Sequence, residues 1–245
     1  MTPLRVAVIS DIHANYHALE AVLAEIDGEE PDELWCLGDL VGYGPRPNRC
    51  TRMIAARATL SLAGNHDLGV IGAEPLELFS PDAAAAAVWS QRVLEPDQRT
   101  YLEGLKPLLR RDDVELYHAS PRDPVWDYVL TEEVAAESLA LTKAPLVLIG
   151  HSHVPLALTI ADGSVAGGVA SAGTEVELAG ARWLINPGSV GQPRDGDPRA
   201  AWLLVDFDAQ RAWFRRVAYP ISETQREILE RGLPPLLAAR LAEGQ

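Results

Sequence analysis

Short runs of apolar residues alternate along the first half of the chain with stretches that repeat at helical spacing. Residues 5–9 predict a strand, because four of these five residues are apolar in succession. Over 19–26 the apolar residues recur at i, i+3, i+4 and i+7, which is the period of an amphipathic helix. The same reasoning predicts strands over 32–37, 59–63, 114–117 and 146–149 and a helix over 48–58. Strands that alternate with helices are typical of an α/β fold with parallel strands.

The pattern changes after residue 153, where short strand-like segments follow one another. Strands are predicted over 156–160, 176–178, 183–185, 202–207 and 213–217, the last two as an antiparallel hairpin. A second sheet, or the second half of a mixed one, is therefore expected. Residues 68–112 predict a largely helical insertion that forms either a cap or a flank, and residues 222–242 predict C-terminal helices. We expect residues 1–245 to form a single domain.

The chain is acidic, with 35 Asp and Glu against 21 Lys and Arg and a formal net charge of −14. This charge disfavours an extended nucleic-acid track, since binding along a phosphate backbone depends on a basic surface. No run approaches the roughly 18 apolar residues of a membrane span, and the first residues do not resemble a secretory leader. We therefore expect a cytoplasmic protein without membrane binding and with no obligate protein partner. Cys36 and Cys50 are expected as buried, reduced thiols.

Polar residues of a restricted set follow five of the predicted strands directly. They are Asp11 and His13, then Asp39, then Asn65, His66 and Asp67, then His118, and finally His151 and His153. Residues just past the carboxyl ends of parallel strands converge on one crevice. A lone histidine after a strand is more often a hydrogen-bonded structural residue, but five such sites in chain order are hard to assign to chance. We therefore predict one site built from all five strand ends.

The residue types at these positions favour a metal centre. Seven oxygen and nitrogen donors suit two metal ions: Asp11, His13, Asp39, Asn65, His118, His151 and His153. Residues two apart in an extended segment point the same way, so Asp11 and His13 are expected on one ion. His151 and His153 have the same spacing, but each could bind a different ion. Imidazole and carboxylate without thiolate favour Mn, Fe, Zn, Co or Ni over Ca or Mg.

The sequence resembles the calcineurin-like metallophosphoesterase superfamily in motifs that occur in this order: Asp11-x-His13, Gly38-Asp39, Gly64-Asn65-His66-Asp67, His118 and Gly150-His151-x-His153. The resemblance spans residues 6 to about 194 and implies a sandwich of two mixed β-sheets flanked by helices, an α/β/β/α arrangement. It implies one ion held by Asp11, His13, Asp39 and His153. The second ion would be held by Asp39, Asn65, His118 and His151, with Asp39 bridging.

The segments next to these motifs resemble one branch of the superfamily. Residues 38–45, 118–124 and 186–194 are similar to those of small bacterial and archaeal phosphoesterases, which include phosphodiesterases and some diadenosine polyphosphate hydrolases. The chain has Gly42-Tyr43-Gly44 where the Ser/Thr protein phosphatases have Asp-Arg-Gly, which argues against protein phosphatase activity. The resemblance thus implies hydrolysis of a small phosphorylated substrate, with phosphodiesters or nucleotide polyphosphates ahead of monoesters. A phosphomonoesterase of the same fold and a non-catalytic metal-binding scaffold are the alternatives.

The expected chemistry assigns roles to a few residues beside the ligands. Two divalent ions, with Mn²⁺ the expected activator, would lower the pKa of a shared water, so no serine or cysteine nucleophile is needed. His66 is the candidate to stabilise or protonate the leaving oxygen, with Asp67 orienting its ring. Arg122 and Arg194 are candidates to bind the substrate phosphate. Tyr43 either lines the pocket or closes a glycine turn.

Overall fold

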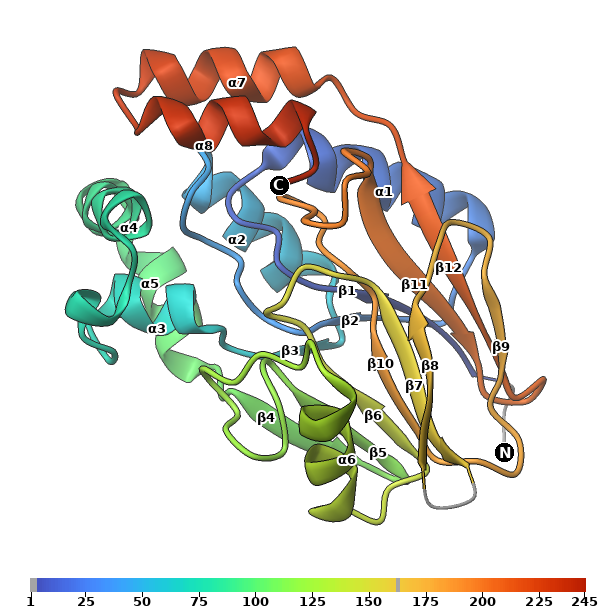
Figure 1. Ribbon diagram of the computed structural model, residues 1–245. Helices are drawn as coiled ribbons and strands as arrows, with labels where there is room; N and C mark the ends of the chain where they lie inside the picture. Colours follow the sequence, from blue (N-terminus) through green and yellow to red (C-terminus); the bar gives the residue numbers. More distant parts are fainter. Residues whose placement is uncertain (1–3, 162–163) are drawn as a thin grey trace.

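Two mixed β-sheets of six strands each form the centre of the computed structural model, which describes residues 4–161 and 164–245 (Figure 1). The first sheet has the strand order β3 (Leu60–Ser61), β2 (Glu33–Cys36), β1 (Arg5–Ile9), β11 (Ala200–Asp206), β12 (Arg211–Val217) and β9 (Glu175–Glu177). The second has the order β4 (Leu108–Arg111), β5 (Val114–Tyr117), β6 (Leu146–Leu148), β10 (Trp183–Asn186), β7 (Leu156–Ala161) and β8 (Ser164–Val169). The strands predicted in the first half of the chain therefore divide between the two sheets.

Strand β1 lies in the middle of the first sheet because both of its faces are buried. It pairs parallel with β2 and antiparallel with β11. Val6 and Val8 pack in the core between the two sheets, whereas Ala7 and Ile9 pack in the core under the helices, and all four are 0% exposed. Successive side chains of a strand point to opposite faces, so a strand covered on both sides reads as a continuous apolar run. The prediction of a strand over 5–9 is confirmed.

Helices cover the outer face of each sheet (Figure 1). Helices α1 (Tyr16–Glu29) and α2 (Pro47–Arg57) pack on the first sheet, and α6 (Glu132–Ala140) packs on the second. Helices α7 (Ile221–Glu230) and α8 (Pro235–Ala239) follow β12, in the segment predicted to hold C-terminal helices. Helix α7 lies beside α1, and α8 packs against α7. These layers confirm the two-sheet sandwich flanked by helices.

The segment 68–112 is helical only in its first part. After α3 (Asn65–Ile71) it contains a short 3₁₀ turn (Leu76–Leu78), α4 (Pro81–Val93) and α5 (Pro96–Gly104). It ends in β4, which pairs antiparallel with β5, so the helical prediction is wrong for 108–111. A four-residue edge strand with two arginines has too little apolar pattern to be recognised locally. Val70, Ala87 and Leu102 join the core beside α2, so the helices form a flank.

Two further elements, α6 and β8, are absent from the predicted set. Thr131 caps α6 by accepting from the backbone N–H of Val134 at 3.3 Å, and two glutamates open its first turn, a signal that could have revealed it. Strand β8 contains two glycines, which weaken a strand pattern, yet it pairs along its length with β7. Cys36 and Cys50 are free and buried, as predicted. Within the described residues, no helix combines the length and apolar character needed to cross a membrane.

Candidate metal centre

The carboxyl ends of five strands meet at one place. Strands β1, β2 and β3 run parallel in the first sheet, and β5 and β6 run parallel in the second. The polar residues that follow these strands are buried, none more than 4% exposed: Asp11, His13, Asp39, Asn65, His66, Asp67, His118, His151 and His153. Charged residues are almost never buried to this degree unless they are paired or bind a metal. The predicted convergence is confirmed, and the edges of both sheets contribute to it.

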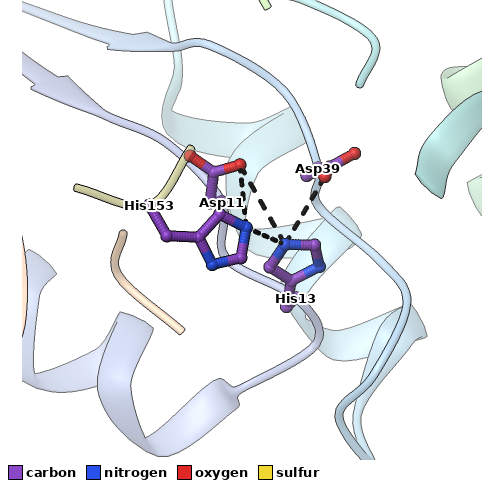
Figure 2. A group of neighbouring side chains, drawn as sticks. All are labelled: Asp11, His13, Asp39 and His153. Carbon is purple, nitrogen blue, oxygen red and sulfur yellow. Dashed lines mark hydrogen bonds and ion pairs between the residues drawn. The ribbon is translucent and has the colours of Figure 1, made fainter. Parts of the chain in front are cut away.

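Asp11, His13, Asp39 and His153 form the first group of this cluster (Figure 2). One ligand atom from each residue lies within 4.8 Å of the others. His13 Nε2 lies 3.0 Å from His153 Nε2 and 3.4 Å from Asp39 Oδ2. His153 Nε2 lies 3.5 Å from Asp11 Oδ1. Metal–ligand bonds of about 2.0–2.2 Å place the ligands of one ion roughly 3–4 Å apart, so this spacing suits one ion.

Asp39, His118 and His151 form the second group, which therefore shares Asp39 with the first. Asp39 Oδ2 lies 3.5 Å from His118 Nε2, and Asn65 Oδ1 lies 3.3 Å from the same nitrogen. Among the described residues, neither Asp39 Oδ2 nor His151 Nε2 has a hydrogen-bond partner, although both are buried. An unpaired buried polar atom costs about 1–3 kcal/mol, and more when it is charged. A cation between these atoms removes that penalty.

Backbone carbonyls decide which ring nitrogen of each histidine faces the cluster. The Nδ1 atoms donate to carbonyl oxygens at 2.6–3.1 Å, in the pairs His13–Val41, His118–Leu37 and His153–Gln192. In a neutral ring the other nitrogen, Nε2, is then an unprotonated acceptor. Two such nitrogens face each other in the His13–His153 pair (Figure 2). Two acceptors cannot hydrogen-bond to one another, whereas both can bind a shared metal ion.

Five of the cluster residues have a left-handed backbone. The angle φ is 54° at Asp11, 49° at His13, 55° at Asp39, 63° at His151 and 60° at His153. Non-glycine residues rarely adopt positive φ, which costs roughly 1–2 kcal/mol each, and such strain gathers at functional sites. Asp11 and His13 do fall in one group, but through this tight turn and not through extended spacing. His151 and His153 fall in different groups, the second of the two options left open by their spacing.

Burial sets the protonation of the cluster. Desolvation raises the pKa of Asp11 to about 7. It also raises the pKa of Asp39 well above its usual range, and repulsion from Asp67 adds to this effect. The same burial lowers the pKa of His13 and His153 well below the ordinary value, so these imidazoles are neutral at pH 7. The cluster thus offers neutral nitrogen ligands and carboxylates that a nearby divalent cation would stabilise as anions.

His66 lies at the cluster, but Asp67 does not orient its ring. The ring of His66 lies 4.8 Å from that of His13, centroid to centroid, and its Nδ1 is buried with no hydrogen-bond partner in the described chain. The carboxylate of Asp67 instead accepts three backbone N–H groups, those of Gly64, Leu40 and Val41, at 2.9–3.1 Å. The predicted orienting role is therefore wrong. Asp67 ties the loop after β2 to the start of α3, which keeps Asp39 beside Asn65.

The two candidate phosphate-binding arginines differ sharply. The guanidinium of Arg194 contacts Gln192 Oε1 at 2.9 Å and the hydroxyl of Tyr43 at 3.3 Å, and no carboxylate of the described chain lies within 4.0 Å of it. Its positive charge acts on the pKa of Asp11 and of the cluster histidines. Arg122 instead pairs with Glu137 at 3.0 Å and Asp127 at 3.7 Å. The structure brings Arg194 to the cluster and pairs Arg122 with Asp127 and Glu137.

Aromatic side chains from three segments surround the cluster, and only Tyr43 among them was expected there from the sequence. Tyr43 has both of the roles left open, since its φ is 54° and its ring lies 4.4 Å from that of His66. Phe79, from the helical segment, lies 5.0 Å from the His66 ring. Tyr128 lies 4.1 Å from the His151 ring, and Trp126 packs edge-on against Phe79. Nothing local distinguishes these three aromatic residues from ordinary core positions.

Comparison with known proteins agrees with this geometry. A family model described as the calcineurin-like phosphoesterase superfamily domain matches residues 4–210. The crystal structure of a metallophosphoesterase from Sphaerobacter thermophilus has a TM-score of 0.91 at 40% identity, with 100% of both chains covered. An uncharacterized protein from Methanocaldococcus jannaschii is 35% identical over 252 residues, again with 100% of both chains covered. The chain belongs to the calcineurin-like phosphoesterase superfamily and is a phosphoric ester hydrolase.

A more distant similarity concerns a nucleotide hydrolase. A symmetrical bis(5′-nucleosyl)-tetraphosphatase from Nitrosococcus oceani is 31% identical over 154 residues, which are 58% of this chain and 52% of that protein. The chain thus aligns with about half the length of that relative. The family and the buried cluster of aspartates and histidines together indicate that divalent metal ions bind here.

Proposed function

We propose that this protein hydrolyses phosphodiester or nucleotide polyphosphate bonds with two divalent transition-metal ions. One observation carries the proposal: two buried groups of ligands share Asp39, and atoms that lack hydrogen-bond partners face one another within them. The ligands proposed for the first ion are Asp11, His13, Asp39 and His153. Those proposed for the second ion are Asp39, Asn65, His118 and His151.

Residues of the chain would complete the reaction site. Two divalent ions, when bound, supply activation of a water molecule and neutralisation of the phosphate oxygens. His66 is proposed to donate a hydrogen bond to the leaving oxygen, because it is buried beside the ligands with one ring nitrogen unpartnered. Arg194 is proposed to bind a phosphate oxygen, with Tyr43 and Gln192 holding its guanidinium group in place.

Two observations support a diester or nucleotide substrate over a simple monoester. The distant relative from Nitrosococcus oceani is a symmetrical bis(5′-nucleosyl)-tetraphosphatase. The aromatic rings of Tyr43, Phe79, Trp126 and Tyr128 lie around the ligand cluster, where a flat group next to the reacting phosphate would contact them. A bare phosphate monoester with a small alcohol would leave these rings without a partner.

The first test measures turnover of bis-p-nitrophenyl phosphate by the full chain with Mn²⁺, together with the metal content. We expect two ions per chain, metal-dependent turnover, and its loss in Asn65→Ala with the circular dichroism spectrum retained. The matched control is Asp27→Asn, since Asp27 is 59% exposed and, among the described residues, pairs with Arg57 alone, at the surface. A fully metallated protein that turns over no phosphoester would refute the proposal and favour the binding scaffold.

A second test separates the substrate classes. The specificity constant kcat/KM is compared for bis-p-nitrophenyl phosphate, diadenosine tetraphosphate and p-nitrophenyl phosphate under the same Mn²⁺ concentration. We expect one of the first two to exceed the monoester by at least tenfold. A preference for the monoester would instead identify a phosphomonoesterase and would overturn the diester assignment while leaving the metal site intact.

A further inference from the structure

A pocket of about 280 Å³ is lined by the start of α2, the helix α4 and the residue that ends α7. These three helices are labelled in Figure 1. None of the proposed metal ligands lines it. Its walls include four arginines, one glutamate and one tryptophan: Arg46, Arg49, Arg52, Arg231, Glu95 and Trp89. A concentration of guanidinium groups is unexpected in a chain with a net charge of −14. The pocket is therefore a basic site in an acidic protein.

The spacing of the arginines explains why they converge. Arg46, Arg49 and Arg52 are three residues apart at the start of α2, so they share one face of that helix. Like charges at this spacing repel one another, and no acidic residue in the first turn of α2 relieves the repulsion. Arg231, which follows the last turn of α7, adds a fourth guanidinium group from the opposite wall.

Only part of this charge is neutralised by the protein. Arg46 pairs with Glu227 through two hydrogen bonds of 2.5–2.7 Å, and Arg52 pairs with Glu95 at 2.6 Å. Within residues 4–161 and 164–245, no carboxylate lies within 4.0 Å of Arg49 or Arg231, and both side chains are exposed. Counting four arginines against the two glutamates that pair with them directly leaves a local charge of about +2. A third carboxylate, that of Glu20, is linked to Arg49 only through the hydroxyl of Tyr16.

Arg49 is held ready for a ligand by the ring of Tyr16. Its guanidinium carbon lies 3.6 Å from the ring centroid, and one N–H group donates to the Tyr16 hydroxyl at 2.7 Å. Stacking leaves the other N–H groups of the planar guanidinium free, and such a group binds phosphate oxygens in pairs. Trp89 supplies a flat apolar wall beside them.

We propose that this pocket binds an anion with two or more linked phosphates. A site with several guanidinium groups suits a ligand with many phosphate oxygens better than a ligand with one carboxylate. A volume of about 280 Å³ also exceeds the space needed for one phosphate. The anion is either a separate ligand or the far end of a nucleotide polyphosphate. The second source is tested because residues 43–46 run from Tyr43, beside the metal centre, to Pro45 and Arg46 on the pocket wall: Gly44 N donates to His13 O at 3.1 Å and Arg46 N to Ala14 O at 3.0 Å.

The test titrates inorganic pyrophosphate into the full-length, Mn²⁺-saturated protein by calorimetry, with free Mn²⁺ held constant. The variant Arg49→Gln/Arg231→Gln removes the two unpaired charges. The matched control Arg57→Gln/Arg226→Gln removes two arginines from the same helices, whose carboxylate partners lie outside the pocket. We expect the pocket variant to lose one pyrophosphate site or to bind it at least tenfold more weakly, while the control binds as the unaltered protein does.

Identical binding by the two double variants and the unaltered protein would overturn the proposal. If the double pocket variant unfolds, the single variant Arg231→Gln decides the question, since this exposed side chain stacks on no aromatic ring of the described chain. Turnover of bis-p-nitrophenyl phosphate is expected to be unchanged in the pocket variants. The calorimetric titration measures binding and needs no turnover, so its outcome does not depend on whether the proposed function is correct. A raised KM for diadenosine tetraphosphate alone would support the far end of the substrate as the ligand. An unchanged KM with pyrophosphate binding lost would support a separate ligand.

Discussion

Two arginines that look equivalent in the sequence, Arg122 and Arg194, are expected to respond very differently to substitution. Arg194 lies beside the ligand cluster, and its nearest polar contacts are the neutral groups of Gln192 and Tyr43. Its Nε is buried without a partner among the described residues. Arg122 is paired with carboxylates, and 35% of its side chain is exposed. Of these two arginines, Arg194 is therefore the one with positive charge available for a substrate phosphate at the metal centre.

The magnitudes follow from these contacts. A hydrogen bond to a charged group contributes about 1.5–3 kcal/mol, and each 1.4 kcal/mol corresponds to a tenfold change. Arg194→Gln should therefore lower kcat/KM for bis-p-nitrophenyl phosphate by roughly 10- to 150-fold. Exposed ion pairs contribute about 0–1 kcal/mol, so Arg122→Gln should change the same constant by less than about fivefold. Arg194→Lys should fall between, since lysine keeps the charge but lacks the planar, two-pronged donor.

The assay is steady-state turnover with saturating Mn²⁺, with thermal unfolding of each variant as the check on folding. Tyr43→Phe removes the hydroxyl that contacts Arg194 and tests whether the arginine acts only by holding Tyr43. That variant should lose much less activity than Arg194→Gln. Equal losses in Arg122→Gln and Arg194→Gln, or a larger loss in Tyr43→Phe, would refute the reasoning.

Three further outcomes are expected. In Gly64→Ala the new Cβ would lie 2.0 Å from Asp39 Oδ1 and would displace this ligand, so activity should need about 10- to 100-fold more Mn²⁺. The control Gly28→Ala adds a Cβ with nothing within 4 Å and should leave the Mn²⁺ requirement unchanged. Asp67→Asn weakens a three-bond backbone tie and should lower stability by about 1–3 kcal/mol in thermal unfolding; an unchanged Tm would contradict the role of the tie. Because burial raises the pKa of Asp11 to about 7 and that of Asp39 well above its usual range, the folded protein holds protons there that metal ions must displace. Mn²⁺ affinity should rise at least tenfold per pH unit from pH 5 to 7, and a flat profile in a metal titration would count against this.

Much of the fold could be predicted from the sequence because the burial of an element determines the local pattern of its apolar residues. The strand over 5–9 and the helix that follows it were recognisable since one element is covered on both faces and the other on one. This pattern does not predict a strand that forms mainly because a neighbouring strand pairs with it. Strand β4 exists because β5 lies beside it, and β8, with two glycines, exists because β7 does. No property of either segment alone predicts those partners.

The candidate site divides in the same way. The sequence alone determined which chemistry is available, because the types of the nine residues after the strands already choose nitrogen and oxygen ligands over thiolates. The tertiary structure brings His13 to within 3.0 Å of His153, 140 residues away, and places Asp39 in both groups, an arrangement that only the family resemblance implied beforehand. It also placed Arg194 at the site, paired Arg122 with carboxylates and surrounded the cluster with aromatic rings. Residue type is a local property, whereas distance, backbone strain and charge pairing depend on chain segments that meet only when both sheets are assembled.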